Sequence, residues 1–209
     1  MALEQMGYVE PREGSKYQGH KSKEDRTFIP DSLNCGLWLS CLDPATTITE
    51  IFDAIRTGAV ASLNLTPAQK GYATAAASLY FMKHSGAELF LAQVNSPRGV
   101  WIHGVRIKAI YNKHGALQQS DLSRSRVLRI QGPAQEMTSE LWQKLWSNSV
   151  IFQLSHVERN QMNGGQAEMY FAFARIDGQA CSAKMLTERQ AELIGLFQCE
   201  YAKDPCDPW

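Results

Sequence analysis

Two stretches of alternating side chains, one in each half of the chain, limit the fold more than any other feature. They are residues 72–82 and 166–175. In each of them every second side chain is apolar, as in a strand with one buried face. The inward residues are predicted to be Ala77, Leu79 and Phe81 in the first stretch and Met169, Phe171 and Phe173 in the second. Each stretch follows a strand-helix-strand pattern and precedes a helix and one more strand. The chain is therefore predicted to contain one β-α-β-β-α-β unit twice, an α+β architecture.

The first unit is predicted to span residues 31–113, after a mobile N-terminal arm over residues 1–30 whose charges cancel. Capping-box spacing between Thr47 and Glu50 predicts the start of its first helix, which ends at Gly58. Its second helix is expected to begin at Ser85. Its strands are expected at residues 36–42, 60–65 and 72–82 and, after a short arm that bends at Gly104, at the end of the stretch 100–112.

The second unit, with a C-terminal tail, is predicted to fill residues 125–209, after a linker over residues 114–124 that shows neither period. Thr138 or Ser139 is expected to cap its first helix. The residues expected on the buried side of that helix are Leu141, Leu145 and Trp146. The remaining elements are expected as strands at 125–131, 150–157, 166–175 and 197–201 and a helix from 179 to about 194.

The charge and the cysteines limit the partners and the compartment. The 209 residues contain 21 Lys and Arg and 21 Asp and Glu, so any nucleic-acid site must be a local patch. No window is long and apolar enough to cross a bilayer, and the N-terminus has no signal-peptide core, so we expect a soluble protein of the nucleus or cytoplasm with no membrane contact. Five cysteines without a C-x-x-C pair fit reduced thiols.

Catalytic and metal sites are not predicted. The five histidines fall on a tail, a helix start, a bend, the linker and a strand, and none is paired with a nucleophile in a recognisable elbow. The sequence has no phosphate-cradling glycine loop and no metal-ligand spacing. We therefore expect neither an enzyme nor a bound cofactor.

Several short runs carry a resemblance to a known family. They are the opening run Phe28-Ile29-Pro30, Gly36-Leu37-Trp38-Leu39, Ala75-Ala76-Ala77, Ser125-Arg126-Val127-Leu128 and the terminal Lys203-Asp204-Pro205-Cys206. Together they resemble tandem RNA recognition motif proteins of a type common in filamentous fungi, over residues 28–208. The resemblance implies two ferredoxin-like units, each with an antiparallel four-stranded sheet backed by two helices, and single-stranded RNA as the partner.

The contact motif of that family is degraded in both units. Its third strand carries two aromatic residues that stack on bases. If Phe81 ends the pattern, those positions fall on Ala76 and Ser78. An earlier register would begin at Lys70 and make Tyr72 a stacking residue, but the later one places Ala87 at the usual distance in the following helix. In the second unit the stacking positions are Glu168 and Tyr170.

The candidate RNA contacts share the outward parity of the two sheets or flank it. On the first strands, Trp38 fills the position of the expected aromatic residue, and Arg129 replaces it in the second unit. The candidates are Trp38, Tyr72, Ser78, Tyr80, Lys108, Asn112, Arg129 and Tyr170.

Each candidate also has a plainer interpretation. Trp38 could be covered by the linker, the arm or the other unit, and Arg129 could pair with Glu168 across neighbouring strands. Tyr72 and Tyr80 could be ordinary amphipathic surface residues, and Lys108 a solvated strand residue.

Three functions therefore stay open. The leading one is binding of single-stranded RNA through the sheet faces or the crevice between the units. The alternative is a protein-interaction or dimerisation module, which the small outward residues Ala76, Ser78 and Ala172 favour. In the third, the two sheets cover one another and bind nothing. The sequence does not fix the oligomeric state.

Overall fold

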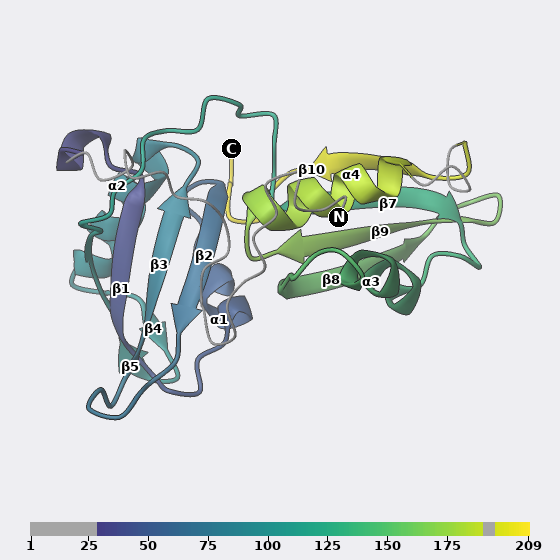
Figure 1. Ribbon diagram of the computed structural model, residues 1–209. Coiled ribbons are helices and arrows are strands. Elements are labelled where there is room, and N and C mark those ends of the chain that lie inside the picture. Colours follow the sequence, from purple (N-terminus) through teal and green to yellow (C-terminus); the bar gives the residue numbers. More distant parts are fainter. Residues whose placement is uncertain (1–28, 190–194) are drawn as a thin grey trace, which may run out of the picture.

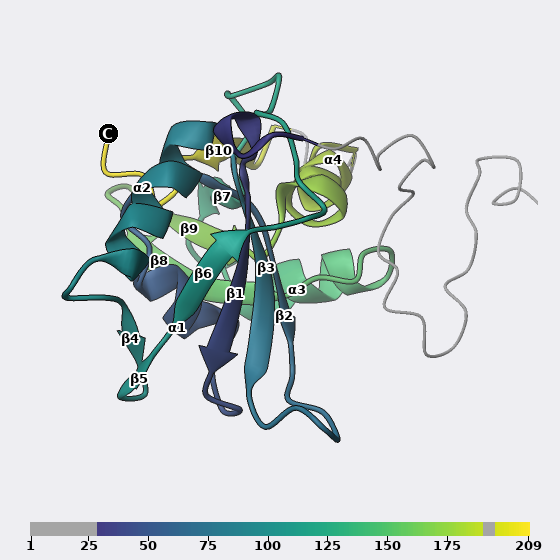
Figure 2. The same cartoon turned by 90° about the vertical axis from the view of Figure 1, so that its left-hand side faces the viewer.

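The computed structural model describes residues 29–189 and 195–209, which form two mixed units of sheet and helix (Figure 1). The strands of one sheet run across the direction of the strands in the other (Figures 1 and 2). In these two ranges, no helix has the length and apolar character that a membrane span needs. All but two residues of the predicted arm, 1–28, lie outside the described part of the chain.

The first unit has a four-stranded sheet with the order β2-β3-β1-β6. Its main elements are β1 (Gly36–Leu42), α1 (Ile48–Asp53), β2 (Val60–Thr66), β3 (Ala75–Phe81), α2 (His84–Asn95) and β6 (Lys108–Tyr111). A small hairpin of β4 (Trp101–Ile102) and β5 (Val105–Arg106) precedes β6, and a 3-10 turn, η3 (Asp31–Leu33), precedes β1. The predicted capping box is present, because the Thr47 side chain accepts a bond from the Glu50 amide and the Glu50 carboxylate accepts one from the Thr47 amide.

The second unit has a four-stranded sheet with the order β10-β7-β9-β8. Its elements are β7 (Val127–Pro133), α3 (Ser139–Ser147), β8 (Leu154–Gln161), β9 (Gln166–Phe173), a π-helical turn η4 (Ile176–Ala180), α4 (Cys181–Arg189) and β10 (Gln198–Ala202). In both sheets all neighbouring strands are antiparallel, with the unit's first and third strands in the centre. The predicted α+β fold with two ferredoxin-like units is therefore confirmed.

The alternating stretches supply the cores. Ala77, Leu79 and Phe81 are at most 1% exposed, as the period-2 pattern predicted. Met169, Phe171 and Phe173 are buried equally well in the second unit.

Some predicted boundaries are wrong. The strand expected from Tyr72 begins only at Ala75, because residues 67–74 form the connection in which Gln69 and Tyr72 exchange backbone hydrogen bonds. The strand expected from Val150 begins at Leu154 and continues to Gln161. This strand runs further because Gly164 and Gly165 both take φ +71° and place the hairpin turn later.

The predicted buried side of helix α3 is correct for two of its three residues. Trp146 is fully buried and Leu145 packs against the core, whereas Leu141 is 39% exposed and Trp142 is buried in its place. Thr138 is the N-cap, and Trp142 and Trp146 lie four residues apart on one face of the helix. The predicted end of the last helix falls on residues 190–194, outside the described residues.

The two units contact each other through backbone hydrogen bonds as well as side chains. The amide of Leu63, on the β2 edge of the first sheet, donates to the carbonyl of Ala174 at 2.9 Å. The hydroxyl of Thr49 in α1 donates to the carbonyl of Ser155 at 2.7 Å. The C-terminal segment after β10 also contacts the first unit, because the carbonyl of Cys206 accepts a hydrogen bond from the amide of Gly58 at 3.0 Å.

A buried ion pair lies at the centre of this contact. Arg126 and Asp204 have side chains that are 2% and 1% exposed, and two nitrogens of Arg126 donate to the two carboxylate oxygens at 2.8 and 3.0 Å. Asp204 also accepts a hydrogen bond from the amide of Val60, in the first unit. The guanidinium carbon of Arg126 lies 3.7 Å from the centre of the Phe52 ring on α1. Residues of both units therefore satisfy one buried pair of charges.

We expect Asp204→Asn to destabilise the protein by about 3–5 kcal/mol, because the guanidinium of Arg126 would stay buried without its counter-charge. Urea unfolding measures this change. Asp53→Asn is the control, because Asp53 is an exposed carboxylate of the first unit. An equal loss in the two variants would contradict the role given to the buried pair.

The thiol of Cys206 reports on the same contact. Burial raises its pKa to about 12, and burial raises that of Cys35 to about 11. We expect iodoacetamide at pH 8 to leave Cys206 unmodified in the native protein, because little thiolate forms and the sulfur is covered. In Asp204→Asn we expect Cys206 to react faster, while Cys35, in the first core, stays protected. Peptide mass mapping after timed alkylation measures both rates. If Cys206 stayed as protected in Asp204→Asn as in the wild type, the contact would not depend on Asp204.

Candidate nucleic-acid interface

The outer face of the first sheet carries the sequence-predicted Trp38 in its centre. On the two central strands Trp38 lies opposite Ser78, and on its other side it lies opposite Ile110. Leu37 and Leu39 are buried on the inner face, so the strand alternation turns Trp38 outward. Trp38 is partly exposed and Ile110 is 63% exposed, so this row of the sheet is open.

A hollow of about 570 Å³ surrounds this row. It is lined by Trp38, Ser78, Tyr80, Ile110, Tyr111, Asn112, Lys113 and His114. That volume lies within the ~300–1,000 Å³ of ordinary small-ligand sites. The hollow combines aromatic rings with two basic residues, a pairing that suits a base with its attached phosphate.

One end of the hollow is held by a polar network. The amide nitrogen of Asn112 donates to the hydroxyls of Ser78 at 3.4 Å and Tyr80 at 3.3 Å. The hydroxyl of Tyr80 donates to the carbonyl of His114 at 3.0 Å. A Cβ at Gly36 would lie 2.6 Å from the Tyr80 ring, so glycine lets this ring pack on β1. Burial raises the pKa of Tyr80, and the residue is a fixed wall of the hollow.

Asn112 was predicted on the open face, and this prediction is wrong, because its side chain is only 6% exposed. The reason is the segment that follows β6. The amide of Cys35 donates to Ala116 at 2.8 Å, and the amide of Gln119 donates to Met82 at 3.0 Å. These bonds fix the start of the predicted linker at the end of the first sheet. Trp38 stays partly exposed beside that segment and is not sealed.

The other two candidates of the first unit lie apart from the hollow. Lys108 is exposed on β6, opposite Ser40. Tyr72 is 75% exposed, but it lies in the connection between β2 and β3 and not on the sheet. The earlier register, which would make Tyr72 a stacking residue of the third strand, is therefore wrong.

The charged side chains on the outer face of the second sheet pair with one another. Arg129 donates to Glu168 and to Glu200, each at 2.7 Å, and to Gln131 at 3.2 Å. The hydroxyl of Tyr170 donates to Glu168 at 3.2 Å. The plainer interpretation of Arg129 is thus correct, and all three of its guanidinium nitrogens already have partners. The carboxylates raise the pKa of Arg129, and the bond from Arg129 lowers that of Glu168, so both stay charged at neutral pH.

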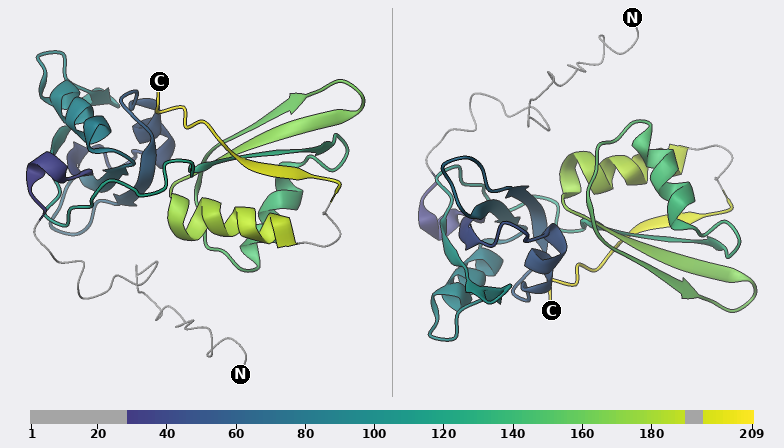
Figure 3. Two further views of the ribbon diagram at one scale, coloured as in Figure 1. Left: turned by 90° about the horizontal axis from the view of Figure 1, so that it is seen from above. Right: turned by 90° about the horizontal axis from the view of Figure 1, so that it is seen from below.

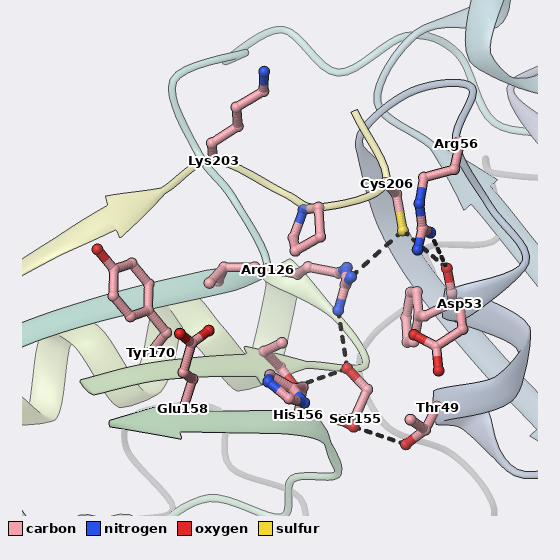
Figure 4. A pocket seen from close by; sticks show the side chains of 14 residues that line it. Thr49, Asp53, Arg56, Arg126, Ser155, His156, Glu158, Tyr170, Lys203 and Cys206 are labelled. Carbon is pink, nitrogen blue, oxygen red and sulfur yellow. Dashed lines mark hydrogen bonds between the residues drawn. The ribbon is translucent and has the colours of Figure 1, made fainter. Parts of the chain in front are cut away.

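A second cavity, of about 430 Å³, lies between the units (Figure 4). Tyr170 and Glu158 lie at one end of it, and at the other end lie Asp53, the last residue of α1, and Arg56, just after that helix (Figure 4). Arg56 donates to the carbonyls of Phe52, in the last turn of α1, and of Ile55, just after that helix. Basic residues (Arg56, Arg126 and Lys203) line this cavity together with the acidic Asp53 and Glu158, so the carboxylates would repel a phosphate backbone there.

The sequence reasoning missed Arg126 and Asp204 as the residues that form the crevice. Both stood inside runs quoted only for their resemblance, Ser125-Arg126-Val127-Leu128 and Lys203-Asp204-Pro205-Cys206. A charged residue next to the apolar start of a strand was the available signal, because such a residue needs a partner when buried.

Comparison with known proteins gives similarity to solved structures only. No known protein family and no curated protein matches the sequence. The two RNA recognition domains of Sex-lethal from Drosophila melanogaster are 12% identical over 81% of this chain and 100% of theirs, with a TM-score of 0.31. The first two domains of yeast Pub1 are 16% identical over 80% and 99%, with a TM-score of 0.32. The three N-terminal domains of yeast Prp24 are 10% identical over 80% and 64%, with a TM-score of 0.34. The assignment of each unit to its fold class rests on the strand orders given above.

The charge network of the second sheet predicts a pH dependence. Because Arg129 holds the pKa of Glu168 below its ordinary value, the ion pair stabilises the fold above the unfolded pKa of about 4.3. That contribution is lost as the pH falls through the lower, folded pKa. We expect Glu168→Gln to lose less stability than the wild type in urea titrations as the pH falls from neutral through the folded pKa of Glu168. Equal slopes in the two proteins would contradict the pairing.

Proposed function

We propose that the protein binds single-stranded RNA on the outer face of the first sheet, with one base stacked on Trp38. The observation that carries this proposal is the hollow around a half-exposed tryptophan in the middle of an open sheet row. An indole ring can stack on any base, because every base has a π-face.

The surroundings of Trp38 suit the rest of a nucleotide. Ser78 offers its hydroxyl to a base edge, and Tyr80 is the wall against which the base would rest. The buried amide of Asn112 holds both side chains in place. Lys113 is exposed at the side of the hollow, where a phosphate would lie, and Lys108 is exposed on β6 outside the hollow. With a single stacking platform worth roughly 1–3 kcal/mol, binding would be weak and sensitive to salt.

The second sheet contributes little in this proposal. Glu168 occupies a stacking position and repels phosphate, and Arg129 is fully engaged by carboxylates. We therefore narrow the candidate contacts to Trp38, Ser78, Tyr80 and Lys108. The exposed Tyr72 could contact only a nucleotide beyond the sheet.

A second candidate function is docking of a protein on the same face. The exposed Ile110 beside Trp38 favours it, because a branched aliphatic side chain does little for a base and much for an apolar contact. The domain division at residues 31–113 and 125–209 and the nuclear or cytoplasmic location stay predictions.

We expect Trp38→Ala to weaken RNA binding at least fivefold, which corresponds to the lower end of one lost stacking platform. Fluorescence anisotropy of labelled single-stranded RNA pools at low salt measures it. Trp101→Ala is the matched control, since Trp101 is 58% exposed on the β4–β5 hairpin and should not change the affinity.

Two results would overturn the proposal. One is the absence of saturable RNA binding by the wild type, and the other is equal affinity in Trp38→Ala and wild type. If RNA does not bind, and a protein partner co-purifies with the wild type and with Trp101→Ala but not with Trp38→Ala, the docking function would replace it.

A further inference from the structure

The exposed face of the second sheet is ordered in rows across its four strands. The helices α3 and α4 lie on the other side of this sheet (Figure 3). The strand pairing places Glu200 opposite Arg129, Arg129 opposite Tyr170, and Tyr170 opposite Glu158. The next row contains Gln198, Gln131, Glu168 and Asn160. An aromatic ring thus lies in the middle of a face with carboxylates on both edge strands.

The charge of this face favours a cationic partner over a nucleic acid. The two rows contain three carboxylates, on Glu158, Glu168 and Glu200, and one cation, on Arg129. Arg129 offsets part of that charge but cannot offset all of it. A phosphate backbone would be repelled. The sheet face that binds bases in RNA recognition motifs therefore favours cations over phosphates in this unit.

Two of the carboxylates have unused capacity. The side chain of Glu158 is exposed, and its carboxylate makes no hydrogen bond or ion pair with any described residue. Glu200 is 61% exposed, and one of its oxygens receives Arg129. Glu158 lies directly across from Tyr170, at a separation where side chains of opposite strands touch.

Tyr170 supplies the flat surface between them. Its ring is partly exposed, and the bond from its hydroxyl to Glu168 limits its rotation. A planar guanidinium can stack on such a ring and still direct two N–H groups at a neighbouring carboxylate. The same face already holds one guanidinium by its charge, because Arg129 pairs with Glu168 and with Glu200.

We propose that this face docks an arginine-bearing segment of another protein, with an arginine side chain stacked on Tyr170 and paired with Glu158. Lysine fits less well, because its ammonium is a compact point charge. It has no planar group to stack on the ring and cannot form a bidentate pair with a carboxylate. This inference concerns a different surface from the hollow at Trp38 and does not depend on the proposed RNA binding.

The test is a titration of the full chain with the peptide acetyl-Gly-Arg-Gly-Arg-Gly-amide, followed by NMR. We expect saturable shifts at Tyr170 and Glu158, and binding at least fivefold weaker for the same peptide with lysine in place of arginine. Glu158→Gln should weaken the arginine peptide at least fivefold. Glu136→Gln is the matched control, since Glu136 is exposed in the same unit, outside the two rows, and should leave the affinity unchanged.

Two further variants separate stacking from charge. Tyr170→Phe keeps the ring and should retain most of the binding, whereas Tyr170→Leu should lose it while the remaining spectrum stays that of the folded protein. The proposal is overturned if the peptide does not saturate, if lysine and arginine peptides bind equally, if Glu158→Gln binds as the wild type does, or if single-stranded RNA shifts this face. Trp38→Ala should bind the peptide normally.

Discussion

The buried pair of Arg126 and Asp204 is the interaction on which the arrangement of the two units depends. Two opposite charges inside a protein are stable only when both stay paired and hydrogen-bonded. Here that requirement is met by groups from both units, because the amide of Val60 and the ring of Phe52 complete the site around a pair from the second unit. A displacement of either unit would take the amide of Val60 and the ring of Phe52 away from the pair. The pair therefore fixes the orientation of the two sheets more firmly than the linker could.

With their orientation fixed, the two sheets present faces of different chemistry. The first has a half-exposed indole in a hollow with basic residues at its side. The second has a tyrosine among three carboxylates, with its only arginine already neutralised. The same β-α-β-β-α-β framework thus offers one surface suited to a base and a phosphate and another suited to a cation. The difference comes from substitutions at a few outward positions, while the inward parity keeps both cores alike.

The inward half of the fold could be predicted from the sequence, and the outward half only in part. The alternation around Leu79 and Phe171 predicted which side chains of each strand face the core, because that pattern is read from local periodicity. The position of Trp38 on the open face followed from the same rule. The burial of Asn112 could not be predicted, because it depends on where the following segment returns. The pair of Arg126 and Asp204 could not be predicted either. Its members are 78 positions apart in the sequence, and no local pattern indicates that they meet.

The central claim is that the two faces differ in what they bind, and one measurement tests it most directly. Isotope-labelled protein is titrated with single-stranded RNA at low salt, and the shifts of indole and amide signals are mapped on the two sheets. The account predicts shifts of the Trp38 indole and of the amides around residues 108–114, with β9 unchanged. Shifts centred on Tyr170, or on both sheets equally, would contradict it.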